Sequence, residues 1–150
     1  MTLAIRNGKL VTAGGRAHGR HQRGVMNATE AAFFDLQRRR AERGEIIGAS
    51  FETHTLALAG GAVYTPDVPV VELDHSKTFY EVKASKLTEP TKRFPLGNRV
   101  PVYKEAAIVR IKIAAALYPQ HRFVMVWRDG PWVWMEKVYG AGYARNGGGA

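Results

Sequence analysis

The chain has 150 residues, of which 45% are hydrophobic and 23% are charged, and it contains no cysteine. This length and composition are typical of one soluble domain that buries its own core. The absence of cysteine excludes disulfides, zinc–thiolate sites and thiol nucleophiles, and fits a reducing compartment such as the cytoplasm. No apolar run is long enough to cross a bilayer and no secretory signal is visible, so we expect no membrane association.

The charge balance is strongly basic, with a net charge of +9 and a sequence pI of about 10.1. Residues 1–26 carry five cations and no acidic side chain. A basic surface favours a polyanionic partner such as nucleic acid, because neutralised phosphates release their counterions. A basic surface can also serve solubility alone, so the charge indicates a class of partner and not a chemistry.

The N-terminal region, residues 1–26, is rich in Gly, Arg and His and is predicted to form a flexible basic arm with a weak strand at residues 9–12. A first helix is expected to begin at Asn27, a favoured N-cap residue. Glu30 follows three residues later and completes the pattern of a capping box. Gly44 is the expected end of this helix.

Short apolar segments after the helix predict strands. Apolar and polar residues alternate over residues 51–58, which favours a strand. A second strand is expected from about residue 62 to 73, bent or partly unpaired at Pro66 and Pro69. A third strand is expected over residues 78–84, and a turn-rich tetrapeptide joins it to the second.

The last third of the chain adds a loop, a helix and a hairpin. Residues 86–101 contain three prolines and several cations and are predicted to form an irregular loop, a kind that is often functional. A helix is expected over residues 102–118, because apolar residues recur at helical spacing and Pro119 follows. Two strands, residues 122–127 and 132–138, complete the series.

This order of elements predicts an α/β fold with a mixed central sheet flanked by helices. We expect one domain over residues 27–139, preceded by the basic arm and followed by a Gly-rich tail at residues 140–150.

The predicted hairpin brings three charged residues together. A turn centred on His75 would place Asp67 opposite Lys83. Alternate residues of a strand share a face, and so do cross-strand partners. Asp67, Glu81 and Lys83 would therefore converge on one face, near the open end of the hairpin. The opposite face of the hairpin would carry the intervening apolar residues Val68, Val70, Tyr80 and Val82.

These residue types suit the hydrolysis of a phosphodiester. Mg²⁺ prefers oxygen ligands, which the carboxylates of Asp67 and Glu81 and the backbone carbonyl of Val82 can supply. Lys83 can orient the attacking water or neutralise the charge that develops on the phosphate. The alternative interpretation is that Glu81 and Lys83 are only a solvated pair on an exposed strand.

The region from Asn27 to Val126 resembles the PD-(D/E)xK nuclease superfamily, and in particular its small phage-encoded members, such as Holliday-junction resolvases. The matching residues are Glu30, the segment Tyr64-Thr65-Pro66-Asp67 and the segment Glu81-Val82-Lys83. The resemblance implies a restriction-endonuclease-like core, with Asp67 and Glu81 as metal ligands and Lys83 in catalysis. It also implies that Glu30 is an additional acid of the site, whereas its alternative role is to cap the helix.

By this resemblance we expect a Mg²⁺-dependent DNA endonuclease, with Mn²⁺ able to substitute, that acts on branched or structured DNA in phage recombination, repair or genome processing. A phage-encoded chain would work in the host cytoplasm. Cutting both strands of a duplex usually needs two active sites, so a homodimer is expected. Two alternatives stay open: a non-catalytic nucleic-acid-binding module on the same fold, and a basic protein with a structural role.

Several further residues have open roles. Trp127, Trp132 and Trp134 either pack across the last hairpin or stack on bases. His54 is the histidine that can best approach the acidic site from a neighbouring strand. Arg110, in the second helix, either contacts phosphate or faces solvent.

Overall fold

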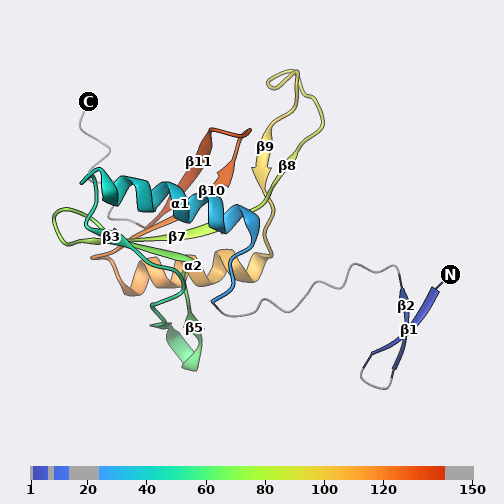
Figure 1. The fold of residues 1–150 in the computed structure, drawn as a ribbon, viewed down its shortest axis with the longest axis horizontal. Coiled ribbons are helices and arrows are strands. Elements are labelled where there is room, and N and C mark those ends of the chain that lie inside the picture. Colours follow the sequence, from blue (N-terminus) through green and yellow to red (C-terminus); the bar gives the residue numbers. More distant parts are fainter. Residues whose placement is uncertain (1, 7–8, 14–23, 141–150) are drawn as a thin grey trace.

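The computed structural model describes residues 2–6, 9–13 and 24–140 (Figure 1). Its centre is a mixed five-stranded sheet in the order β11-β10-β7-β6-β3, in which β10 and β7 are parallel and the other neighbours antiparallel. The strands are β3 (Gly48–Ala49), β6 (Val68–Val71), β7 (Lys77–Lys83), β10 (Arg122–Arg128) and β11 (Trp134–Tyr139). Two helices accompany the sheet, α1 (Ala28–Glu42) and α2 (Glu105–Leu117). The predicted mixed α/β fold is confirmed.

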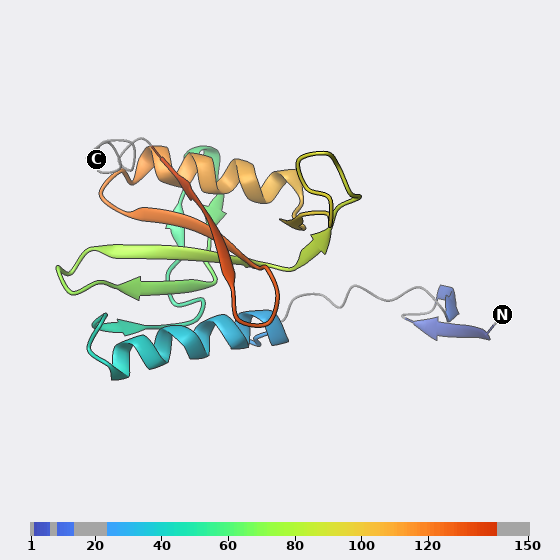
Figure 2. The same ribbon diagram turned by 90° about the horizontal axis from the view of Figure 1, so that it is seen from above.

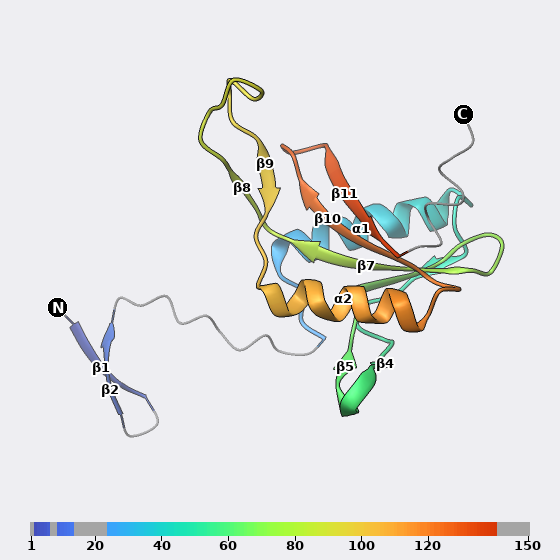
Figure 3. The ribbon, with the colours of Figure 1, turned by 180° about the vertical axis from the view of Figure 1, so that it is seen from behind.

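Three two-stranded antiparallel sheets lie outside the central sheet. They are β1 (Thr2–Arg6) with β2 (Lys9–Ala13), β4 (Leu56–Ala57) with β5 (Val63–Tyr64), and β8 (Ser85–Leu87) with β9 (Arg99–Pro101). A short 3-10 helix, Ala59–Gly61, joins β4 to β5. Figure 3 shows the β8–β9 and β4–β5 hairpins projecting from opposite sides of the central sheet.

The helices cover opposite faces of the sheet, as Figure 2 shows. Phe33 of α1 packs with Val68, Tyr80 and Val124 from the sheet in one buried cluster. On the other face, Ile111 of α2 belongs to a second cluster, which includes Phe79, Phe123 and Met125. Both clusters use alternate residues of the same strands, so β7 and β10 are buried on both faces and form the centre of the domain.

Helix α1 begins where the sequence predicts. The side chain of Asn27 accepts a hydrogen bond from the Glu30 N–H (2.9 Å), and the Glu30 Oε2 accepts one from the Asn27 N–H (2.9 Å). The helix ends at Arg43, and Gly44 follows with a φ of 73°, which a residue without Cβ adopts readily. The capping box and the predicted end at Gly44 are both confirmed.

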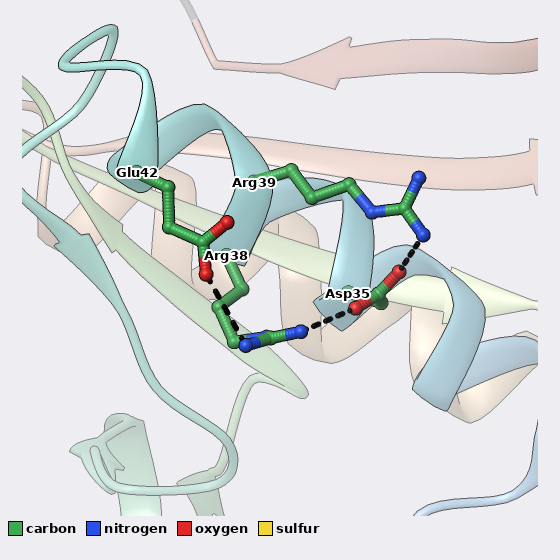
Figure 4. A network of polar contacts seen from close by, with 4 residues as sticks. All are labelled: Asp35, Arg38, Arg39 and Glu42. Atoms are coloured by element: carbon green, nitrogen blue, oxygen red, sulfur yellow. Dashed lines mark hydrogen bonds and ion pairs between the residues drawn. The ribbon is translucent and has the colours of Figure 1, made fainter.

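The solvent-facing side of α1 carries a ladder of ion pairs (Figure 4). Asp35 pairs with Arg38 (3.0 Å) and Arg39 (2.8 Å), and Arg38 also pairs with Glu42 (3.2 Å). Exposed pairs of this kind contribute little to stability because water and salt screen them. The position of α1 on the sheet therefore depends on Phe33 and its apolar neighbours.

The predicted strand over residues 51–58 is largely wrong. Within this range only the two-residue β4 is a strand, and β3 ends before it at Ala49. Glu52 has a φ of 50°, a left-handed conformation that breaks an extended chain. The interruption predicted at Pro66 is confirmed, because β5 ends at Tyr64 and pairing resumes only at Val68, whereas Pro69 lies within β6 and pairs with Phe79.

Two predictions for the next region need correction. Residues 86–101 are not wholly irregular, because β8 and β9 form a hairpin there. Helix α2 begins at Glu105, three residues later than predicted, because the Val102 N–H donates to the Ala84 carbonyl (2.8 Å) and keeps the chain extended past β9. The helix ends before Pro119 and the last two strands form, as predicted.

The strand predicted at residues 9–12 is confirmed as β2, and its partner β1 was not predicted. The remainder of the predicted arm, residues 14–23, and the tail at residues 141–150 lie outside the described residues, so the flexible arm stays a prediction. No helix in the described part of the chain combines the length and the apolar character needed to cross a bilayer.

Candidate active site

The register of the β6–β7 hairpin differs from the predicted one by two residues. Val68 pairs with Tyr80 and Val71 with Lys77, so the turn is centred on Asp74 and not on His75. Continuing this register places Asp67 opposite Glu81, whereas the predicted register placed it opposite Lys83. Side chains alternate with a period of two, so the shift leaves all three charged residues on the predicted face.

Asp67 lies just before β6 and is tied to its surroundings by both backbone and side chain. Its Oδ2 accepts a hydrogen bond from the Val82 N–H (2.8 Å). Its carbonyl oxygen accepts one from the Glu52 N–H (2.9 Å). The side chain of Asp67 thus continues the hydrogen bonding between β6 and β7 beyond the last paired residues, Val68 and Tyr80. This bond holds the carboxylate at the carboxyl end of β7.

Glu81 is fixed from two sides within the same buried region. Its Oε1 accepts from the Lys83 ammonium (2.7 Å), and its Oε2 accepts from the Tyr64 hydroxyl (2.8 Å). Burial raises the pKa of Tyr64 well above its ordinary value, so the hydroxyl keeps its proton and acts as the donor. The Glu81 and Lys83 side chains are only 10% and 21% exposed, respectively, so the interpretation of a solvated surface pair is wrong.

The electrostatics of the site oppose the ionisation of both buried carboxylates. Burial, followed by repulsion from Glu81, raises the pKa of Asp67 from 3.8 to about 8. The hydrogen bond from Val82 and the charge of Lys83 act in the opposite direction, and Glu30 adds a smaller repulsion. One ammonium therefore does not offset the carboxylates that the fold gathers here, and a further cation would stabilise their charged forms.

Glu30 reaches this region because the start of α1 is tethered to it. The Gly24 N–H donates to Glu52 Oε2 (2.6 Å), and Glu52 in turn bonds the backbone of Asp67. The first turn of α1 is thereby held beside the carboxyl end of β7. Glu30 is buried and uses one carboxylate oxygen in the capping box. The capping role is therefore observed, while the metal role of Glu30 stays a prediction.

These residues line one open pocket of about 560 Å³. Glu30, Asp67, Glu81 and Lys83 all contribute to it, so every predicted site side chain is present. The structure adds Tyr64, Glu52 and Arg110, to which sequence analysis gave no definite role. The sequence could have indicated Tyr64 through its place in the Tyr-Thr-Pro-Asp segment. It gave no indication of Glu52, because the alternating pattern around that residue favoured a strand.

The oxygen donors of this pocket fit a hard divalent cation. Among the described residues, no group of three or more His, Asp or Glu side chains forms a ready-made metal cage. Mg²⁺ seldom uses such a cage, since it usually binds one or two carboxylates and completes its shell with water and substrate phosphate. Asp67 and Glu81 are the two carboxylates that fit this role, and the Val82 carbonyl stays a predicted third ligand.

The other residues singled out in the sequence lie elsewhere. His54 is near Lys77 (Nε2 to Nζ, 3.5 Å) at the start of β7, so it does not approach the acids at the end of that strand. Trp134 packs edge-on against Phe33 (5.1 Å), and Trp127 donates from Nε1 to the Arg99 carbonyl (3.1 Å). These two tryptophans therefore have packing roles, whereas Trp132 is 90% exposed.

Comparison of the chain with protein-family models, curated proteins and solved structures gives no match.

The raised pKa of Asp67 predicts a pH-dependent stability in metal-free buffer. Between about pH 4 and pH 8 the folded state keeps a proton that the unfolded state loses, so the free energy of unfolding falls as pH rises. The Asp67→Asn variant lacks this titration and keeps an oxygen that can accept from Val82. We expect its stability relative to the wild type to improve between about pH 5 and about pH 8.5, as measured by urea unfolding in EDTA. If the difference in the free energy of unfolding between the variant and the wild type does not change with pH, the raised pKa of Asp67 is contradicted.

The hydrogen bond from Tyr64 to Glu81 predicts a stability cost for Tyr64→Phe. The variant leaves a buried carboxylate without one donor, and bonds to charged groups contribute about 1.5–3 kcal/mol. Tyr118→Phe is the matched control, because its hydroxyl donates to the neutral Ala57 carbonyl (2.8 Å) at an exposed position. Urea unfolding in EDTA should show the larger loss for Tyr64→Phe. Equal losses would show that the Tyr64–Glu81 bond has no special weight.

Proposed function

We propose that this protein is a metal-dependent endonuclease that hydrolyses phosphodiester bonds in DNA. The observation that carries the proposal is a pair of buried carboxylates, Asp67 and Glu81, that line one pocket. Lys83 lines the same pocket and forms an ion pair with Glu81. Ionising both buried carboxylates is costly, and a bound cation offsets that cost. The mixed sheet between two helices is compatible with the restriction-endonuclease-like core that the sequence resemblance implies.

Each residue has a role that follows from its contacts. Asp67 and Glu81 bind the cation, and Tyr64 orients Glu81 through its hydrogen bond. A bound Mg²⁺ would lower the pKa of a water molecule and polarise the phosphate. Lys83 bonds Glu81 and also lines the open pocket, so its ammonium can stabilise the charge that develops on the phosphate oxygens.

Arg110 gives the pocket a second cation, which comes from helix α2 on the face of the sheet that carries Glu81 and Lys83. It is exposed on α2, and it lines the same pocket as Lys83 on β7. A phosphate entering between these cations would meet positive charge from two elements before it reaches the acids. The net charge of +9 further favours a DNA backbone as the substrate. Branched or structured DNA as the preferred form, and a homodimer as the assembly, are parts of the same proposal that rest on the resemblance.

The proposal predicts cleavage that depends on both metal and site. Purified protein should nick supercoiled plasmid and cut a synthetic four-way junction with Mg²⁺ or Mn²⁺, and EDTA should abolish both activities. Asp67→Asn and Lys83→Ala should each lower the rate by at least about 100-fold, because each removes a group that acts on the transition state.

Lys77→Ala is the matched control for Lys83→Ala. Both lysines are half-buried at the two ends of β7 and have the same parity along it, but only Lys83 lines the acidic pocket. The control should therefore keep its cleavage rate. Equal cleavage by wild type and both site variants would contradict the proposal. DNA binding without metal-dependent cleavage would instead support the non-catalytic binding module.

A further inference from the structure

We propose that the β8–β9 hairpin is a nucleic-acid-binding arm that begins beside the acidic pocket and binds unpaired bases at its tip. This inference rests on the proposed function for the identity of the neighbouring site, and on separate observations for the arm. The arm comprises residues 85–101. It projects away from the central sheet, as Figures 1 and 3 show.

The arm is attached directly to the site. Strand β7 ends at Lys83, and β8 begins two residues later at Ser85. The returning strand β9 is held to β10 by the hydrogen bond from Trp127 Nε1 to the Arg99 carbonyl. The base of the arm is therefore fixed beside Lys83, so nucleic acid bound along the arm would extend from the acidic pocket toward the tip.

The tip of the arm is built by specific hydrogen bonds. The Phe94 N–H donates to the Thr91 hydroxyl (3.0 Å), and the Thr91 N–H donates to the Phe94 carbonyl (2.9 Å). Gly97 has a φ of 79° and allows a close approach, since a Cβ there would lie 2.4 Å from the Thr88 carbonyl oxygen. The loop thus has a defined shape that presents its side chains outward.

The tip exposes apolar side chains. Leu96 is 88% exposed and Phe94 is 39% exposed, and Leu87, at the end of β8, is 58% exposed. The guanidinium of Arg93 lies over the Phe94 ring, 5.3 Å from its centroid. An ordered loop that leaves such groups in water indicates a binding surface. An aromatic ring with a stacked Arg is a platform on which an unpaired base can stack.

The charge of the arm selects the partner. It carries four exposed cations and one carboxylate, namely Lys86, Lys92, Arg93 and Arg99 against Glu89. A second copy of the chain would bring the same cations to the interface and be repelled. A phosphate backbone is attracted instead, and bases exposed along it match the apolar tip. Paired bases in a duplex are stacked and leave no face for Phe94, so the arm favours single strands and junctions.

The test is binding of labelled oligonucleotides in EDTA, measured by fluorescence anisotropy without cleavage. Wild-type protein should bind a single strand, and Phe94→Ala should weaken this binding about tenfold or more while changing duplex binding little. Phe94→Trp keeps an aromatic face and should retain the wild-type affinity. Leu96→Ser should also weaken single-strand binding. Leu73→Ser should not, because Leu73 is an exposed leucine in the turn before β7, at the other end of the sheet.

Three results would overturn the inference. The first is wild-type affinity of Phe94→Ala for the single strand. The second is an equal loss of single-strand and duplex binding, which would indicate phosphate contacts alone. The third is dissociation of an oligomer by Leu96→Ser in size-exclusion chromatography, which would make the tip a contact between copies. Wild-type protein that binds as expected but never cleaves would contradict the proposed endonuclease and leave the arm intact.

Discussion

The burial of Asp67 opposite Glu81 is the constraint on which the rest of the site depends. Burial, followed by repulsion from Glu81, raises the pKa of Asp67 to about 8. The fold opposes this repulsion with the Val82 N–H, the Tyr64 hydroxyl and the Lys83 ammonium. These three donors reduce the cost of the charges without neutralising them, which leaves the site suited to a cation.

The topology of the sheet explains why the charges meet there. Strand β7 lies between β6 and β10 and is buried on both faces, so its side chains have little freedom to move. At its carboxyl end the apolar layer gives way to Glu81 and Lys83. The first turn of α1 and the start of the β8–β9 hairpin reach the same end of the strand (Figure 2). The apolar core thus fixes the position of the site, while the site itself opens to solvent.

Local signals in the sequence predicted both helices and four of the five strands of the central sheet. The capping box of Asn27 and Glu30 is a contact between near neighbours, so its pattern was sufficient to place the start of α1. The hairpin register was wrong by two residues, because the turn residue His75 adopts a φ of 68° and shifts the centre of the turn to Asp74. The site survived this error because two residues is one full period of a strand.

Contacts between distant segments could not be predicted in this way. The bond from Tyr64 to Glu81 and the tether from Gly24 through Glu52 to Asp67 join residues that share no local pattern. The left-handed conformation of Glu52 also conflicts with the alternation around it, which favoured a strand. Such residues are set by tertiary packing, and they are the ones that complete the pocket.

The central claim is that the carboxylates at the end of β7 bind a divalent cation. A crystal structure determined after soaking with Mn²⁺ tests it directly through anomalous scattering. The account predicts one anomalous peak within about 2.0–2.6 Å of a carboxylate oxygen from both Asp67 and Glu81. The claim would be contradicted by a well-ordered site without an anomalous peak, in which Lys83 and Tyr64 still donate hydrogen bonds to the two carboxylate oxygens of Glu81.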